Sequence, residues 1–514
     1  MEKYERRTGK LGKTKDKKLR SFLKRGDLKS KDAAEKAADA EILLTESNGY
    51  LEPENEMEQT YKVKQEDIVA NVDLATANKK ISLDLPNFGP YSIDYSLTGN
   101  YLLLGGRKGH VSSFNWKLGE MGCELQLQET VHDVKYLQND YECFAVAQKK
   151  YVYLYDQFGA EIHQLKHHVG ATHLEYLPYH YLLATAGTTG YIKYQDVSTG
   201  QLVAELRTKL GNTTALRQNP YNAVLNAGHS NGQVSLWAPN MSTPLVKLLS
   251  SRGPVRSISV DRSGNYMAVA GQDKSLKIWD IRRFAVLEEY YSPKPASSTS
   301  ISASGLLSVG WSSHVQIWKD VLARSGEKVS APYMNHLLPG HQVETVRFCP
   351  SEDILGIGST KGFDSMIVPG SGEANVDALE INPYSYATRT GRRETQVKML
   401  LEKLQPDTIT LNPNDIGKVD SRSHAERLSA SQKQAEEEHQ ALLDKQKLNA
   451  LPGTKPANSR LRKMLRKKTK NVVDQRKMRI EHAWEREKQA RENIKRKAEG
   501  LEVKTTGAAM RRFM

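Results

Sequence analysis

The sequence predicts an all-β fold, a seven-bladed β-propeller flanked by basic N- and C-terminal extensions that are partly helical or disordered. Two landmarks predict the blades, because an apolar strand end and the polar turn before it both recur about every forty residues. Charge predicts the flanks: residues 1–31 hold thirteen Lys/Arg against four Asp/Glu, and residues 455–514 hold twenty against seven. The formal net charge of +14 therefore comes from the two ends, and the middle of the chain is acidic.

Residues 255–282 show the pattern of one blade. Three apolar, strand-like runs are separated by turns at 261–265 and 272–275, and the last run ends at Ile278-Trp279-Asp280. Alternating apolar residues predict half-buried strands, and a closing Trp-Asp pair is typical of a WD repeat. A small sheet of this kind cannot bury its own faces, so it must stack against further copies.

The same strand end recurs along the chain. Its residues are structural blade marks, namely Trp116, Asp156, Asp196, Trp237, Trp279, Asp280 and Trp318. The turns before these strands keep the same register, at 106–110, 148–150, 187–190, 229–232, 272–275, 311–314 and 359–362. Two independent landmarks therefore agree on a WD-repeat propeller of seven blades.

The propeller is expected over residues 86–380. Residues 1–59 are expected to form a basic arm, a short helix and an acidic linker. Residues 60–85 lead into the propeller, and we expect them to lie against its outside or to close its ring. After the propeller we expect an extension over residues 381–450 and a basic helical tail over residues 451–514.

Local patterns add expectations within these regions. They are a disordered arm at 1–31, a short helix at 31–46, an inserted loop at 322–341, a helix at 395–404, a polar helix at 421–448 and a charged helix at 473–499. The helix at 395–404 has Val397, Leu400, Leu401 and Leu404 at helical spacing. That apolar stripe predicts a contact with a protein partner.

Two sets of motifs resemble one family. The first set leads into the first blade: DI at 67–68, VDL at 72–74, FGPY at 88–91 and LLGGRKGH at 103–110. The second set follows the last blades: GFDSM at 362–366, PGSGE at 369–373, NPY at 382–384, RRE at 392–394 and LLEKL at 400–404. Together they resemble the nucleolar WD-repeat protein family of the small-subunit processome, with its characteristic C-terminal extension, over most of residues 60–420.

The resemblance implies a non-catalytic scaffold and RNA-binding component of the processome. Such a protein acts in pre-rRNA processing and 40S ribosomal subunit assembly, in the nucleolus of the nucleus. The implied partners are pre-ribosomal RNA, a box C/D small nucleolar RNA and other processome proteins. Periodicity and charge show only a rigid scaffold with basic arms. A second hypothesis is therefore a propeller adaptor that binds proteins, with basic tails that serve only nuclear localisation.

Clustered cations are the candidate RNA contacts, because each phosphate contact releases counterions from the nucleic acid. They are chosen by charge alone, and they are Lys13, Lys17, Lys18, Arg392, Arg393, Lys463, Arg466, Lys467, Lys468 and Lys470. Seven of the eleven residues at 460–470 are cationic. This tract equally fits a nuclear-localisation signal, and the two roles do not exclude each other.

Catalytic and cofactor-binding patterns do not stand out. GKT at 12–14 ends like a phosphate-binding loop, but Arg7 occupies the place of its first glycine. Cys123, Cys143 and Cys349 lack C-x-x-C spacing, so neither a zinc site nor a disulfide framework is indicated. No run of about eighteen apolar residues predicts a membrane span. We therefore expect no enzyme activity, cofactor, metal, membrane contact or small-molecule substrate.

Overall fold

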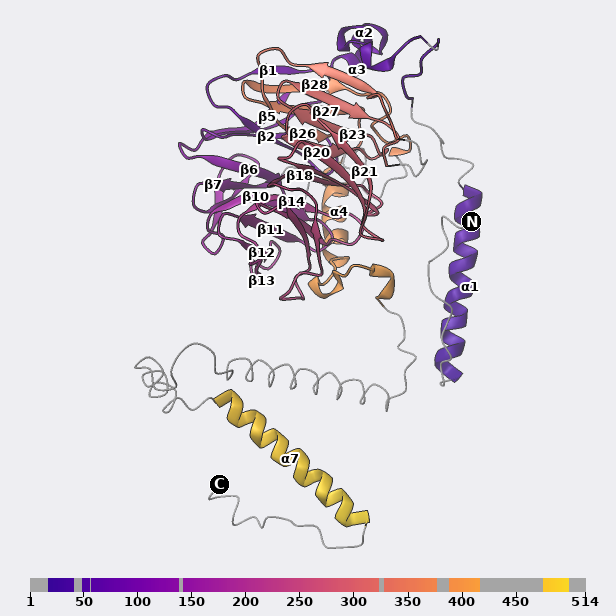
Figure 1. The fold of residues 1–514 in the computed structure, drawn as a ribbon, viewed down its shortest axis with the longest axis vertical. Helices are drawn as coiled ribbons and strands as arrows, with labels where there is room; N and C mark the ends of the chain where they lie inside the picture. The colour runs from indigo at the N-terminus through magenta and orange to yellow at the C-terminus, as the bar shows by residue number, and fades with distance from the viewer. Residues whose placement is uncertain are drawn as a thin grey trace. The chain divides into compact units, whose positions relative to one another are not determined.

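A computed structural model describes residues 17–40, 49–55, 57–137, 142–322, 328–376, 388–416 and 475–498. In this part of the chain, strands β1 to β28 form seven four-stranded antiparallel sheets (Figure 1). The first strands of neighbouring sheets contact one another all the way round, from β2 and β6 to β26 and β2, so the sheets surround one axis. The seven-bladed propeller predicted from the sequence is confirmed.

Each blade runs from the axis outward. The first three blades consist of β2 (Tyr91–Tyr95), β3 (Tyr101–Gly106), β4 (His110–Asn115), β5 (Glu120–Gln126); β6 (Val131–Tyr136), β7 (Cys143–Gln148), β8 (Val152–Asp156), β9 (Glu161–Leu165); and β10 (Ala171–Leu177), β11 (Leu182–Gly187), β12 (Tyr191–Asp196), β13 (Leu202–Arg207). The next three consist of β14 (Thr213–Gln218), β15 (Leu225–His229), β16 (Gln233–Trp237), β17 (Val246–Leu249); β18 (Val255–Val260), β19 (Tyr266–Gly271), β20 (Ser275–Asp280), β21 (Ala285–Tyr291); and β22 (Ser298–Ile301), β23 (Leu307–Trp311), β24 (His314–Trp318), β25 (Met334–Leu337).

The seventh blade joins the two ends of the propeller. It consists of β26 (Val343–Phe348), β27 (Ile354–Ser359), β28 (Gly362–Ile367) and, as its outer strand, β1 (Ser82–Asp84). β1 pairs antiparallel with β28, with Leu83 opposite Phe363. Figure 1 shows this pairing as an indigo strand beside an orange one. The N-terminal strand therefore closes the ring by hydrogen bonding to the last strand.

Apolar side chains between neighbouring blades form the core. Second strands such as β11 and β27 are buried along their whole length, because a blade lies on each side of them. This burial explains why such strands appear in the sequence as short continuous apolar runs. Trp237 is fully buried and Trp279 is 7% exposed, and both belong to one cluster that spans the third to fifth blades.

The up-and-down order of the strands gives the propeller two faces. We call one the loop face: it carries the loops between blades and the turns between second and third strands. Backbone hydrogen bonds tie these loops to these turns, for example from Leu127 N to Gly109 O (2.8 Å) and from Ser292 N to Lys274 O (2.9 Å). The opposite face carries the turns between first and second strands and between third and fourth strands.

Segments from both ends of the chain lie on the opposite face. Their elements are η2 (Thr60–Lys62), α2 (Gln65–Asn71) and α3 (Leu74–Ala77) before the propeller, and α4 (Arg389–Leu401), η4 (Pro406–Thr408) and η5 (Pro413–Asp415) after it. The Gln65 amide donates to Ile367 O and accepts from Ile367 N, both at 2.9 Å. Leu51 N donates to the Tyr333 hydroxyl at 2.8 Å. Residues 49–81 are thus fixed to the sixth and seventh blades.

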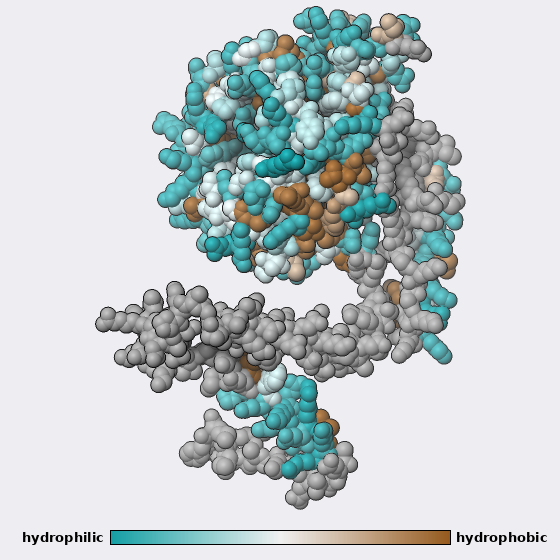
Figure 2. Space-filling view, viewed as in Figure 1, coloured by the Kyte–Doolittle hydropathy of each residue, from teal (hydrophilic) through white to brown (hydrophobic). Residues whose placement is uncertain are grey.

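Two long helices lie near the chain ends. α1 (Lys17–Ala40) shows that residues 17–31, which were expected to be disordered, are helical. Lys, Arg, Leu and Ala all favour helix, and the single Gly26 does not end it. α7 (Gln475–Ala498) lies within the predicted charged helix and belongs to a different unit of the chain from the propeller. Figure 2 shows α7 as mostly hydrophilic. The polar helix expected at 421–448 lies outside the described residues.

The prediction of an inserted loop at 322–341 is wrong for its second half. Met334–Leu337 forms β25, the outer strand of the sixth blade, which pairs with β24. The sequence hides this strand because outer strands are half exposed and MNHL is not an apolar run.

Candidate functional site

The structure does not bring the described candidate RNA contacts into one site. Lys13 and the tract formed by Lys463, Arg466, Lys467, Lys468 and Lys470 lie outside the described residues. Lys17 and Lys18 are exposed in the first turn of α1. Arg393 is exposed on α4, which also contains Arg392. All ten stay predictions.

The blade marks lie at the ends of third strands and make contacts within the fold. Trp116 Nε1 donates to Gly99 O at 2.8 Å. Trp237 Nε1 donates to Ser235 Oγ at 2.8 Å, and that hydroxyl lies 2.6 Å from His229 Nε2. Trp318 lies with its ring centroid 5.6 Å from that of Tyr290. Asp156 and Asp280 each accept from a backbone N–H of the following turn. These marks therefore organise turns and inter-strand contacts.

Charged side chains of the first strands meet at the propeller axis. They are Asp94 of β2, Lys135 of β6, Glu175 of β10, Arg217 of β14 and Arg347 of β26. Glu175 lies 3.1 Å from Lys135 Nζ and 3.0 Å from Arg217 Nη1, and Arg347 pairs with Asp94. A cavity of about 180 Å³ opens beside this group. The ion pairs connect five blades across the axis.

Pairing sets the protonation of this axial network. Burial alone would raise the pKa of Glu175, but three neighbouring cations outweigh it and lower the pKa to about 2. Asp133 accepts a hydrogen bond from Leu174 N at 2.9 Å, and burial raises its pKa to about 6. Glu175 therefore stays ionised at neutral pH and holds cations in place. The arrangement stabilises contacts between blades.

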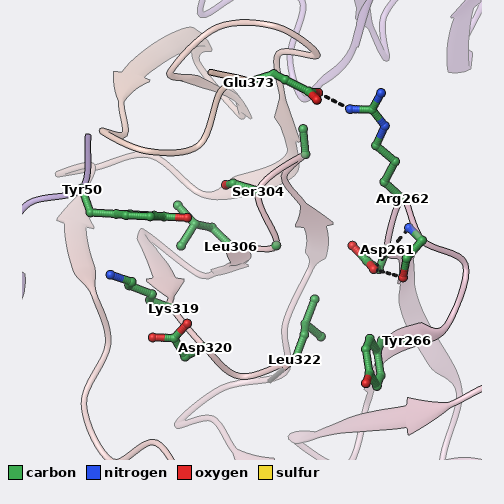
Figure 3. A pocket seen from close by; sticks show the side chains of 13 residues that line it. Tyr50, Asp261, Arg262, Tyr266, Ser304, Leu306, Lys319, Asp320, Leu322 and Glu373 are labelled. Carbon is green, nitrogen blue, oxygen red and sulfur yellow. Dashed lines mark hydrogen bonds and ion pairs between the residues drawn. The ribbon is translucent and has the colours of Figure 1, made fainter. Parts of the chain in front are cut away.

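A second cavity, of about 600 Å³, lies on the opposite face between the fifth and sixth blades (Figure 3). Its charged groups have partners within the chain: Arg262 pairs with Glu373, and Lys319 Nζ lies 3.9 Å from the ring centroid of Tyr50. Tyr50 comes from the N-terminal segment and Glu373 from the residues after β28. Three separate parts of the chain therefore meet at this cavity.

Residues 388–416 cross the opposite face over the second to fourth blades. Gln396 Nε2 donates to Glu142 Oε1 at 2.9 Å, and Lys403 Nζ lies 2.5 Å from Asp196 Oδ2. Burial opposes ionisation of Asp196, but hydrogen bonds from Lys403 and Ser198 lower its pKa overall. Ile409 is only 1% exposed and belongs to the same core cluster as Trp237. The ion pair of Lys403 with Asp196 and the buried side chain of Ile409 therefore anchor the segment to the propeller.

The helix expected at 395–404 ends at Leu401, so Leu404 of the predicted apolar stripe lies just after α4, and the stripe is exposed. Val397, Leu400, Leu401 and Leu404 are 57%, 52%, 82% and 45% exposed. Four large apolar side chains on one segment are unusual at a surface that contacts only water. The protein partner expected for this stripe stays a prediction.

Two family models match this chain. The model described as "Nucleolar protein 10-like, N-terminal domain" matches residues 82–357, and the "BING4CT (NUC141) domain" matches residues 332–412. The chain is 52% identical over 504 residues to "U3 small nucleolar RNA-associated protein 7" of Saccharomyces cerevisiae, which covers 95% of this chain and 90% of the yeast protein. The chain belongs to the nucleolar WD-repeat protein family of the small-subunit processome.

The chain is also similar to proteins from animals. "WD repeat-containing protein 46" from mouse and from human are both 44% identical over 404 residues. The alignment covers 78% of this chain in each case, and 64% of the mouse and 65% of the human protein.

The boundaries of the two matches agree with the architecture of this nucleolar WD-repeat protein. The propeller match begins at Ser82, the first residue of β1. The BING4CT match begins just before β25 and ends before η5, so it includes the seventh blade from β26 to β28 as well as α4. The BING4CT match therefore joins the last blade of the propeller to the C-terminal segment that crosses its opposite face.

Sequence reasoning missed the axial network and the anchors of the C-terminal segment. Lys135, Glu175, Arg217 and Arg347 each occupy the fifth position of a first strand, so an alignment of the repeats could have identified them. Ile409 gave no such signal, because one isoleucine in a Pro-rich segment does not predict burial. Among the described residues, no group of three or more His, Cys, Asp or Glu could hold a metal ion, and no helix is long and apolar enough to cross a membrane.

Proposed function

We propose that this protein is a non-catalytic scaffold and RNA-binding component of the small-subunit processome, acting in pre-rRNA processing and 40S ribosomal subunit assembly. Its partners are pre-ribosomal RNA, a box C/D small nucleolar RNA and other processome proteins. It acts in the nucleolus.

One observation carries this proposal: the 52% identity, over 95% of the chain, to a yeast protein named for its association with U3 small nucleolar RNA. Identity at this level extends beyond the propeller, which by itself supports many unrelated functions. The propeller model named after a nucleolar protein supports the proposed location.

Charge supports the RNA partner. Residues 455–514 carry twenty Lys/Arg and seven Asp/Glu, and the axial charges of the propeller are already paired with one another. Cationic arms release counterions when they follow a phosphate backbone, so their binding weakens as salt rises. The proposed contacts in the C-terminal tract are Lys463, Arg466, Lys467, Lys468 and Lys470.

The scaffold role is supported by the contacts of two buried ionisable side chains. Three neighbouring cationic side chains keep Glu175 ionised, and the buried His229 is hydrogen-bonded to Ser235. The exposed apolar stripe of α4 supports protein partners in addition to RNA.

The test compares salt-dependent binding of the purified full-length chain to an in vitro transcribed box C/D small nucleolar RNA. Replacing the five tract cations by Gln should weaken binding by about one to three orders of magnitude at moderate salt. It should also flatten the slope of log K against log salt by about 3 to 4 units. A matched control replaces five cations of α7, Arg486, Lys488, Arg491, Lys495 and Arg496, by Gln, which gives the same net charge.

Each result decides between hypotheses. Unchanged affinity and slope in the tract variant would leave the tract as an import signal only. Equal losses in both variants would show that net charge, and not this tract, determines binding. A wild-type chain that does not bind the RNA in low salt would overturn the proposed RNA-binding function and favour the protein adaptor. In cells, an unrelated nuclear import signal must be added to the variant, because the same cations can serve import.

A further inference from the structure

Exposed cations gather on the loop face of the propeller. The turns between second and third strands and the loops between blades contain ten Lys/Arg and two Asp/Glu. The cations are Arg107, Lys108, Lys149, Lys150, Lys166, Lys209, Arg252, Lys274, Lys294 and Lys361, and all ten are exposed. They come from six of the seven blades, so positive charge surrounds most of the axis on this face.

The opposite face has no such excess. Its described turns contain six Lys/Arg and five Asp/Glu. Arg262 and Arg282 there pair with Glu373 and with Asp280. This face is also covered over several blades by residues 49–81 and 388–416. The two faces therefore differ both in charge and in whether the chain itself occupies them.

The cations of the loop face are not neutralised within the described chain. None of the ten forms an ion pair with a carboxylate there. Of the two acids in these loops, Asp273 already accepts hydrogen bonds from Ser275 and from Arg252 N. Ten like charges on one side of a rigid domain raise the local potential and attract a polyanion.

Lys274 occupies a turn position where the backbone favours glycine. It has φ of 65°, in the left-handed region, at the last position of its turn. Gly109, Gly190 and Gly232 occupy the equivalent position in other blades, with φ of 104°, 69° and 81°. Glycine adopts this conformation without steric cost and lysine does not. The Lys274 side chain is exposed, so this turn adds a cation to the loop face where other blades have glycine.

We infer that the loop face is a docking surface for the phosphate backbone of folded RNA, separate from the basic tails. The inference rests on the proposed function for the identity of its partner. RNA fits better than an acidic protein, because nucleic-acid interfaces are polar and positively charged, whereas protein interfaces have apolar and aromatic centres. Val169 is the only large apolar side chain that is exposed in these loops.

We expect RNA binding by the loop face to depend little on base sequence. The cations lie on eight of the short loops and turns at the sheet ends, so the face is preformed and its contacts are electrostatic. The tails would then add contacts to an RNA that the propeller already holds, which raises the effective concentration of both.

The test uses the full-length chain and an in vitro transcribed, hairpin-rich RNA. Replacing Arg107, Lys108, Lys149, Lys150 and Lys166 by Gln should weaken binding about 10- to 100-fold near 0.15 M salt and flatten the salt slope by at least about 2 units. The matched control replaces Arg282, Arg283, Lys319, Lys328 and Lys398 by Gln, which removes the same charge from the other side. That control should keep wild-type affinity and slope.

A single substitution separates binding from folding. Lys274→Gly restores the residue type that the backbone prefers, so it should keep or raise the melting temperature while it weakens RNA binding about 2- to 5-fold. A variant that only damaged the fold would lower both.

The outcomes distinguish this inference from the proposed function. Equal affinity of the loop-face variant and wild type overturns the loop-face surface. If the tail variant then loses binding, the RNA-binding function stands without it. Equal losses in the loop-face variant and its control also overturn the inference. If the loop-face variant keeps RNA affinity but loses binding to polyglutamate, the face docks an acidic protein. If wild type binds no RNA, both proposals fail together.

Discussion

His168 shows how one buried side chain connects the stability of the propeller to pH. It is 1% exposed, and its Nδ1 lies 2.6 Å from Thr185 Oγ1 while its Nε2 lies 3.3 Å from Gln195 Oε1. Burial lowers its pKa from 6.5 to about 4. Three further histidines have a pKa lowered by burial to about 4, and they are His173, His180 and His229.

Acidification should therefore destabilise the propeller through these histidines. The unfolded chain binds each proton near pH 6.5 and the folded chain only near pH 4, so the stabilisation is complete above pH 6.5 and is lost as pH falls toward 4. Between pH 7 and pH 5, His168 alone should account for about 2 kcal/mol of unfolding free energy. His168→Gln should make the pH dependence shallower by that amount in urea denaturation.

Asp133 has the opposite effect, because its raised pKa makes the folded state more stable as pH falls. Asp133 is present in every variant, so its effect cancels when variants are compared with wild type. The matched control is His163→Gln at an exposed position, which should keep the wild-type pH dependence. An unchanged slope in the His168 variant would mean that its imidazole reaches solvent and accepts a proton in the folded state.

The C-terminal segment shows how one element is fixed by a few contacts. Ile409 inserts into the core cluster of the third to fifth blades, and Lys403 pairs with Asp196 of β12. α4 lies before both anchors and exposes Val397, Leu400 and Leu401, so the anchors decide where these side chains are presented.

Ile409→Asp should release the segment, because a carboxylate cannot be buried there without a partner. We expect residues 388–416 to become protease-sensitive and to exchange amide hydrogens faster, while the propeller stays folded. Ile416→Asp is the control, since Ile416 is 42% exposed and tolerates the same charge. Equal protection of the segment in both variants would mean that Ile409 is no anchor.

The propeller as a whole depends on a closed ring. β1 covers the edge of β28, and Leu85 N donates to Lys361 O at 2.6 Å beside it. An uncovered strand edge is a template for pairing with another chain. The ring closure therefore protects the molecule from association as well as from opening.

Deleting residues 1–85 should leave the outer edge of β28 unpaired, lower the melting temperature and cause association in light scattering. Deleting only residues 1–48 retains β1 and the segment on the opposite face, so it is the control and should stay monodisperse. If both truncations melt and scatter alike, β1 does not hold the ring closed.

Much of this architecture follows from local sequence. Strands such as β19 alternate or are continuously apolar, and turns such as 272–274 are polar, so the repeat identified seven blades. The predictions for β25 and for residues 17–31 were wrong for different reasons. An outer strand is half exposed and MNHL is not an apolar run. The high positive charge of residues 1–31 favours disorder, whereas Leu19, Phe22 and Leu23 at helical spacing favour the helix that forms.

The sequence alone determined the repeat, the family motifs and the charge of the ends, because each depends on residue types at fixed spacing along the chain. Only the tertiary structure decided that β1 closes the ring, that Ile409 is a core residue and that Glu175 meets three cations at the axis. It also decided that ten cations scattered between Arg107 and Lys361 share one face. These features join residues far apart in sequence, and only the circular arrangement of the blades brings them together.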